Sequence, residues 1–278
     1  MIIAIRGASG FIGKALSAEL HRRGHSVMPL ARNEFPHNGT DIVFNLGGEN
    51  IAAGRWTAKR KSAIWDSRVG ATTELVVHLG TMTPPPSIFL CASAIGIYGD
   101  HPELEVNEGS SAGHGFLADT CRAWEQAAAT ATAHGIRTIQ ARMGMVLHPD
   151  GGALAKMMPA FKLGLGGRLG DGNQWVSWIS RHDCVEALIR LVEDDRFSGP
   201  VNLVSPNPLI QKDFASALGR FLNRSTFSPI PPFVLKLLFG EMAQELLLAG
   251  QRVVPGVLEA NGFKFRDHQI ENAWGNSR

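Results

Sequence analysis

The stretch that decides the fold is at the start of the chain, where residues 2–24 read IIAIRGASGFIGKALSAELHRRG. The apolar run Ile2–Ile5 predicts a short buried strand, and Lys14–Arg23 predicts an amphipathic helix that ends at Gly24. Between them, residues 7–13 form a glycine turn with GxxGxxG spacing. Glycines in a strand-turn-helix context let backbone approach a pyrophosphate, and the helix N-terminus offers free N–H groups to it. The segment therefore predicts a dinucleotide-binding Rossmann unit.

The end of the second predicted strand, Ser26–Ala31, favours one cofactor over another. An acidic residue at this place would bind the ribose of NAD, whereas an arginine accommodates the additional phosphate of NADP. Arg32 occupies that place, and Glu34 is a weaker acidic candidate two residues later. We expect NADP(H), although an exposed surface arginine is the plainer interpretation of Arg32.

Strand and helix patterns continue to alternate through the first half of the chain. The predicted strands are followed by predicted helices at Thr57–Leu79, Phe116–His134 and Ala153–Leu163. Such alternation predicts an α/β fold with a doubly wound parallel sheet, because each parallel crossover needs a helix. We place the NADP-binding Rossmann domain at residues 1–150, with a return at about 180–205. Residues 151–278 then form mainly a small, helix-rich C-terminal substrate lobe.

Composition excludes several classes of protein. The net charge of +2 comes without a Lys/Arg stripe, so we expect no nucleic-acid partner. The chain shows no signal peptide and no apolar stretch near the ~20 residues of a membrane helix. The three cysteines are scattered and have no metal-ligand spacing, so we expect no metal and a reducing, cytoplasmic location.

With these residues in hand, the chain resembles the atypical, extended short-chain dehydrogenase/reductase family often labelled "epimerase family protein" or "nucleoside-diphosphate-sugar epimerase". The resemblance runs nearly end to end. It rests on residues 45–51 (NLGGENI), Arg55-Trp56, Ser67-Arg68, residues 93–99 (SAIGIYG), residues 164–167 (GLGG) and a C-terminal module that includes residues 239–241 (FGE) and 250–253 (GQRV). It implies a Rossmann domain, bound NADP(H) and a small C-terminal lobe over the site. The substrate is not implied.

The chain departs from this family at two places. Only eight residues, 33–40, separate Arg32 from the next strand, which is too short for the additional strand and helix usual in relatives. We therefore expect a sheet that lacks one strand. The second departure concerns catalysis. The family uses a Tyr acid/base with a Lys four residues later, yet Tyr98 is the only tyrosine and Pro102 stands four residues after it.

The helix that should carry the Tyr and Lys is also without them. Alignment on Glu125 puts Leu117 at the tyrosine position and Cys121 at the lysine position, and Ala94 falls where the serine is usual. Ser93 lies one residue from that position. The catalytic residues are therefore unknown, with Ser93 and Tyr98 as weak candidates. Each has a plainer alternative, a backbone hydrogen bond for Ser93 and a packing role for Tyr98.

Several other residues have no assigned role. Cys121 and His182 are further candidates, with an inert buried thiol and a helix start as their plainer interpretations. Glu49, Arg68 and Trp56 lie in the family-like segments without an assigned role. The residues expected to bind cofactor share a place in the glycine turn or at strand ends. They are Gly7, Ser9, Gly10, Phe11, Ile12, Gly13, Arg32, Leu46, Gly47, Gly48, Ala92 and Arg142.

Two functions of different classes fit these observations. The first is an NADP(H)-dependent oxidoreductase or epimerase-like enzyme with nonstandard acid/base residues. It would act on an unknown small molecule such as a nucleotide sugar or a carbonyl compound. The second is a non-catalytic protein that senses NADP(H) as a ligand. Related folds often form homodimers through paired helices, but no helix face here is assigned to that role.

Overall fold

The computed structural model describes residues 1–227 and 229–274. Its centre is a parallel sheet of six strands in the order β10-β6-β4-β3-β1-β2. In that order the strands are Gly199–Leu203, Arg137–Met143, Ile88–Ala94, Ile42–Asn45, Ile2–Arg6 and Ser26–Leu30. The strand order reverses between β1 and β3, which is where doubly wound folds bind ligands. The predicted Rossmann-type α/β fold is confirmed.

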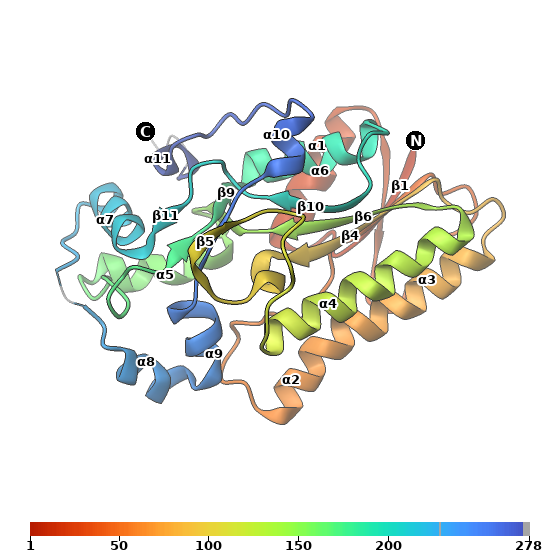
Figure 1. Ribbon diagram of the computed structural model, residues 1–278. Helices are drawn as coiled ribbons and strands as arrows, with labels where there is room; N and C mark the ends of the chain where they lie inside the picture. Colours follow the sequence, from red (N-terminus) through yellow and green to blue (C-terminus); the bar gives the residue numbers. More distant parts are fainter. Residues whose placement is uncertain (228, 275–278) are drawn as a thin grey trace.

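Helices cover both faces of the sheet (Figure 1). One face carries α1 (Phe11–Arg22) and α6 (Arg181–Glu193), which pack on each other. The opposite face carries a nearly continuous helical run and, beside it, α4 (Phe116–Ala129). That run consists of α2 (Ala58–Trp65), the π-helical turn Asp66–Gly70 and α3 (Ala71–Thr81). Both faces of the strands are therefore buried, in keeping with their apolar sequences.

The short connection after β2 explains the missing strand. Residues 31–41 contain neither helix nor strand, so β2 is the edge of the sheet, as the eight-residue spacing predicted. The buried Arg6 holds the connection by donating from Nη2 to the carbonyl of Glu34 at 2.8 Å. Phe35 stacks on His78 of α3, with 4.7 Å between ring centroids. Arg6 and Phe35 thus tie the short connection to β1 and to α3.

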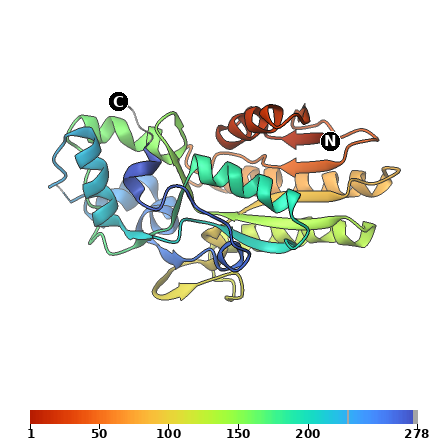
Figure 2. The same cartoon turned by 90° about the horizontal axis from the view of Figure 1, so that it is seen from above.

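A second body of structure lies at the carboxyl ends of the strands (Figures 1 and 2). Its helices are α5 (Gly152–Lys162), α7 (Gln211–Leu222), α8 (Pro232–Phe239), α9 (Glu241–Ala243) and α11 (Ile270–Ala273). It also holds three two-stranded sheets, which pair β7 (Met145–His148) with β9 (Trp178–Ser180), β8 (Trp175–Val176) with β11 (Leu209–Ile210), and β5 (His101–Val106) with β12 (Gln251–Val253). Trp178 and Trp274 lie at the centre of its core.

The chain passes between the two bodies more than once. After the lobe begins, α6 and β10 return to the Rossmann sheet, in the region of residues 180–205. The C-terminal part also returns, because α10 (Gly256–Ala260) packs beside β10 and places Leu258 in the main core. The start of α6 is capped as its sequence predicted, since Ser180 Oγ accepts a hydrogen bond from the Asp183 N–H.

Candidate cofactor site

The glycine turn is packed so tightly that only glycine fits at two of its positions. Gly7 has a φ of +91°, and a Cβ there would lie 2.9 Å from the backbone N of Gly47. A Cβ on Gly13 would lie 2.1 Å from the carbonyl oxygen of Gly7. The first contact joins the turn to the end of β3, and the second seats α1 on the turn. Together they form the kind of close backbone cradle that a diphosphate requires.

The N-terminus of α1 is open toward ligands. Gly10 is the N-cap residue and has no side chain to satisfy the first helical N–H groups. The first α-helical hydrogen bond of this end runs from the N–H of Lys14 to the carbonyl of Gly10, at 3.0 Å. Ser9 and Gly10 are exposed, whereas Phe11 and Ile12 are half-buried. The first turn therefore offers free N–H donors and the positive end of a helix dipole to an anion.

Arg32 lies two residues after the end of β2 and is exposed, but it is not an isolated surface arginine. Its Nη2 is 2.7 Å from Glu49 Oε1, and Arg60 Nη1 is 3.2 Å from the other oxygen of Glu49. The hydrogen bond from Arg32 lowers the pKa of the Glu49 carboxyl. One carboxylate thus lies between two guanidinium groups, which leaves a net positive charge at the place where the extra phosphate of NADP is expected.

The loop after β3 brings further cations to the same region. Leu46 and Gly47 are half-buried, and Gly48 is exposed. Gly47 lies against the aliphatic stem of Arg6, and Gly48 lies against the guanidinium of Arg68. Two residues further on, Asn50 Oδ1 accepts a hydrogen bond from Lys156 Nζ at 3.2 Å. The predicted residues 46–48 therefore adjoin the glycine turn and lie within a mostly basic surrounding.

Arg142 is part of a buried ion pair rather than a free cofactor ligand. Its Nε and Nη2 each donate to Glu125 at 2.8 Å, in the bidentate geometry that holds such pairs firmly. Burial alone would lower the pKa of Arg142, but the hydrogen bonds with Glu125 outweigh that effect and raise it. Ser93 donates to the same carboxylate at 2.6 Å. Both predicted residues are thus occupied with Glu125 of α4.

Tyr98 continues this network into the interior. Its side chain is fully buried, and its hydroxyl accepts from Arg142 at 2.9 Å and donates to Asn202 Oδ1 at 2.7 Å. Desolvation raises the pKa of Tyr98 despite the nearby Arg142. A buried, doubly bonded hydroxyl with a raised pKa is poorly placed to exchange protons with a ligand. The structure therefore favours the packing role of Tyr98 over an acid/base role.

The remaining candidates, Ala92 and Cys121, are buried in the structure. Ala92 is buried within β4, directly opposite Ala141 of β6. Cys121 is buried on α4, and desolvation raises the pKa of its thiol to about 12. Such a thiol is not a nucleophile at neutral pH. Glu125 and Asn202 were not predicted as site residues from the sequence. Their contacts join residues that are far apart in the chain, so no local pattern indicates them.

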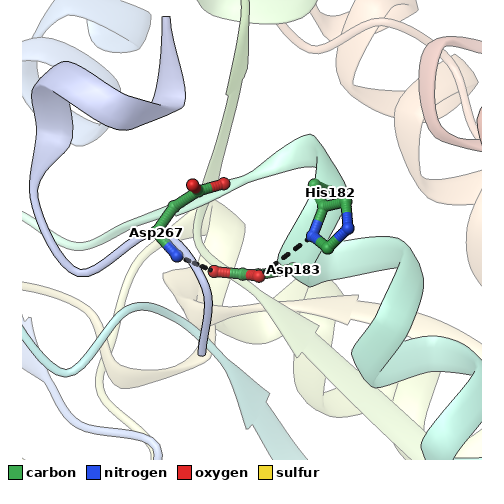
Figure 3. A group of neighbouring side chains, drawn as sticks. All are labelled: His182, Asp183 and Asp267. Atoms are coloured by element: carbon green, nitrogen blue, oxygen red, sulfur yellow. Dashed lines mark hydrogen bonds and ion pairs between the residues drawn. The ribbon is translucent and has the colours of Figure 1, made fainter. Parts of the chain in front are cut away.

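His182, Asp183 and Asp267 form the one described group with a metal-like spacing (Figure 3). Asp183 accepts from the backbone N–H groups of Arg266 and Asp267, at 3.1 and 2.9 Å, and lies 3.2 Å from His182 Nδ1. The carboxylate of Asp267 instead pairs with Arg266 at 3.0 Å. These acidic groups fasten the C-terminal segment to the start of α6, which agrees with the helix-start interpretation of His182.

A hollow of about 520 Å³ adjoins this group between α1 and α6. The described residues that line it, among them Ala15, Arg181 and Arg266, include none of those expected to bind cofactor. We place the site at the glycine turn instead, because the free helical N–H groups and the strand-order reversal coincide there and not at the hollow.

The fold and the glycine turn define a dinucleotide-binding protein of the Rossmann class. The chain belongs to the NAD dependent epimerase/dehydratase family, which matches residues 3–203. Residues 230–276 match a domain of unknown function, DUF1731. An epimerase family protein of Mycobacterium tuberculosis is 42% identical, with 99% of this chain and 96% of the relative covered. The resemblance inferred from the sequence is thereby confirmed.

Solved structures give the same result. The crystal structure of human epimerase family protein SDR39U1, isoform 2, with NADPH has a TM-score of 0.91 to this chain at 29% identity, covering 98% of this chain and 97% of the human chain. A nucleoside-diphosphate sugar epimerase from Corynebacterium glutamicum has a TM-score of 0.80 at 32% identity, covering 98% of this chain and 57% of that one. In the part of this chain that the structure describes, no helix is both long and apolar enough to cross a membrane.

The Gly13 contact yields a first prediction. Gly13→Ala should lower the free energy of unfolding by at least ~1–3 kcal/mol, because the new methyl overlaps the Gly7 carbonyl and the turn must open. Gly70→Ala is the matched control, since a Cβ on that helical glycine meets nothing within 4 Å. Urea unfolding measures both. Equal stability of the two variants would contradict the tight turn.

A second prediction concerns Tyr98. Tyr98→Phe removes two buried hydrogen bonds and should cost ~1–3 kcal/mol of unfolding free energy. Because the hydroxyl bonds Arg142 and Asn202 rather than a residue of the glycine turn, nicotinamide fluorescence titration should show unchanged NADPH affinity. Any turnover found for the protein should also survive the substitution at a temperature where the variant is folded. Complete loss of turnover in a folded variant would restore Tyr98 as an acid/base group.

The thiols give a third prediction. Cys91, Cys121 and Cys184 are buried and free, and desolvation raises the pKa of each to about 12. At pH 8 we expect very slow alkylation by iodoacetamide in the native protein and rapid alkylation of all three after denaturation. Mass spectrometry of quenched samples reports both rates. Prompt labelling of the native Cys121 would show a reactive, accessible thiol.

Proposed function

We propose that this chain binds NADP(H) at its glycine turn and uses it as an oxidoreductase or epimerase-like enzyme that lacks the usual Ser, Tyr and Lys. The observation that carries the proposal is the pairing of two features. The open N-terminus of α1 offers free N–H groups to a diphosphate, and the Arg32–Glu49–Arg60 cluster provides positive charge just after β2. The NADPH in the human relative's structure supports the same choice of cofactor.

When bound, the nicotinamide would supply or accept a hydride. Residues of the glycine turn and of the strand ends would bind the rest of the dinucleotide. The N–H groups of Phe11, Ile12 and Gly13 would hold the diphosphate, while Arg32 would pair with the ribose phosphate. Leu46, Gly47 and Gly48 would provide backbone close to the dinucleotide, since two of them have no side chain to obstruct it.

The substrate proposal is coarser. A hydride acceptor or donor of the family type would be a carbonyl compound or a nucleotide sugar, held between the Rossmann domain of residues 1–150 and the lobe of residues 151–278. With Tyr98, Ser93 and Arg142 engaged in buried bonds, the proton would come from the substrate, from water or from a group in the lobe. The three free thiols fit a reducing compartment such as the cytoplasm.

One observation favours a second candidate, a protein that senses NADP(H) without catalysis. Ser93 and Tyr98, the acid/base candidates at the carboxyl end of β4, are both engaged in hydrogen bonds that hold the structure together. Steady turnover of NADPH with any carbonyl compound or nucleotide sugar would support the enzyme. Tight binding with no turnover across such a panel would support the sensor.

The cofactor proposal is tested by titrating the protein with NADPH and NADH while nicotinamide fluorescence is followed. We expect tighter NADPH binding, and we expect Arg32→Ala to weaken NADPH by ~10- to 100-fold, the worth of a charge-assisted hydrogen bond, with little effect on NADH. Arg220→Ala, an exposed arginine of α7 paired with Glu271, is the control. Absence of binding to either nucleotide would refute the proposal.

A further inference from the structure

Arg68 lies in one of the segments that resemble the family, and no role has yet been assigned to it. It lies in the π-helical turn Asp66–Gly70 between α2 and α3, a kind of distortion that often marks functional sites. Its Nη1 donates to the carbonyl of Ile64 at 3.3 Å and approaches Ser67 Oγ at 3.5 Å. Its guanidinium lies 5.3 Å from the ring centre of Trp124 on α4. The side chain is therefore held by its own helical run and by α4.

The charge of Arg68 has no acidic partner among residues 1–227 and 229–274 within the 4.0 Å of an ion pair. Other enclosed arginines differ. Arg142 has Glu125, Arg60 has Glu49, and Arg6 donates from both Nη atoms to backbone carbonyls. Burial lowers the pKa of Arg68, and the electrostatic effects of Cys121 and Glu49 oppose that lowering only in part. An enclosed cation without an ion-pair partner is stabilised when an anion binds to it.

The guanidinium faces the ligand side of the fold. A Cβ on Gly48 would lie 3.0 Å from Cζ and 3.1 Å from Nη2 of Arg68, so the group rests on the backbone of the loop after β3. The preceding residue, Gly47, meets Gly7 of the glycine turn. On its other side, Arg68 is near enough to Cys121 for its charge to act on the thiol, whose pKa burial raises. Arg68 thus lies at the carboxyl ends of β3 and β4.

We propose that Arg68 binds an anionic group, a phosphate or a carboxylate, of a ligand held at the carboxyl ends of β3 and β4. This inference rests on the proposed cofactor function, because it places Arg68 beside the dinucleotide. The anion can come from the diphosphate of NADPH or from a substrate bound next to it. In both cases a planar guanidinium fixed over Trp124 can donate two parallel hydrogen bonds to two oxygens.

The test compares Arg68→Gln and Arg68→Lys with Lys59→Gln, which removes one exposed charge from the adjoining helix α2. NADPH and 2′-AMP are titrated into each protein, and inorganic phosphate is titrated into the NADPH complexes. The 2′-AMP carries the ribose phosphate but no diphosphate, so it probes the Arg32 end alone. Thermal unfolding of the free protein and of the NADPH complex is recorded in parallel.

We expect Arg68→Gln to weaken NADPH by ~10-fold or more with 2′-AMP affinity unchanged, which assigns the anion to the cofactor diphosphate. If NADPH affinity is unchanged but phosphate no longer binds the complex, the anion belongs to the substrate. Arg68→Lys should recover part of either loss. In both cases the Tm of the free Arg68→Gln protein should equal or exceed that of the wild type, because an enclosed charge without an ion-pair partner is removed.

The inference is overturned if binding of NADPH and of phosphate by Arg68→Gln stays at the wild-type level, whatever the Tm of the free protein. That result would make Arg68 a structural residue. Failure of the cofactor proposal itself is distinguishable, because the wild-type protein would then bind neither NADPH nor 2′-AMP, and Arg68→Gln would not be the cause.

Discussion

The close approach of Gly7 to Gly47 and of Gly13 to Gly7 is the constraint on which the rest of the structure depends. It brings the ends of β1 and β3 and the start of α1 to one place at the reversal of the strand order. A side chain at Gly7 or Gly13 would separate these elements by more than the core can absorb. With glycine there, the helix presents unpaired N–H groups where three neighbouring strands end. The close packing of the glycines and the free N–H groups of α1 together form the candidate dinucleotide site.

A second feature is a buried network of hydrogen bonds at the carboxyl ends of β4 and β6. The side chains at the ends of β4 and β6 that would be expected to do chemistry form a buried chain of hydrogen bonds, from Ser93 through Glu125 and Arg142 to Tyr98 and Asn202. Removing one member would leave a buried charge or polar group without a partner, which is costly. The network therefore ties β4, β6, β10 and α4 together. The chain thus has the glycine turn of the Rossmann class, while Ser93, Arg142 and Tyr98 are engaged in buried hydrogen bonds.

The sequence predicted what local patterns determine. The strand-turn-helix at residues 2–24, the cap at Ser180 and the lost strand after β2 all follow from spacing and short-range chemistry. Contacts between distant residues did not follow. Nothing near Arg142 in the chain indicates that Glu125 neutralises it, and nothing near Arg32 indicates that Glu49 does. The return of residues 256–260 to the main core was missed for the same reason, since a short helix has little periodicity to show which surface it covers.

Hydrogen exchange of backbone amides, with and without NADPH, tests the central claim most directly. The account predicts that NADPH slows exchange in peptides covering residues 7–13 and 46–50, where free N–H groups and the basic loop meet. Peptides covering residues 181–186 and 265–268, beside the hollow between α1 and α6, should exchange unchanged. Protection confined to those latter peptides would contradict the account, because the nucleotide would then bind outside the glycine turn.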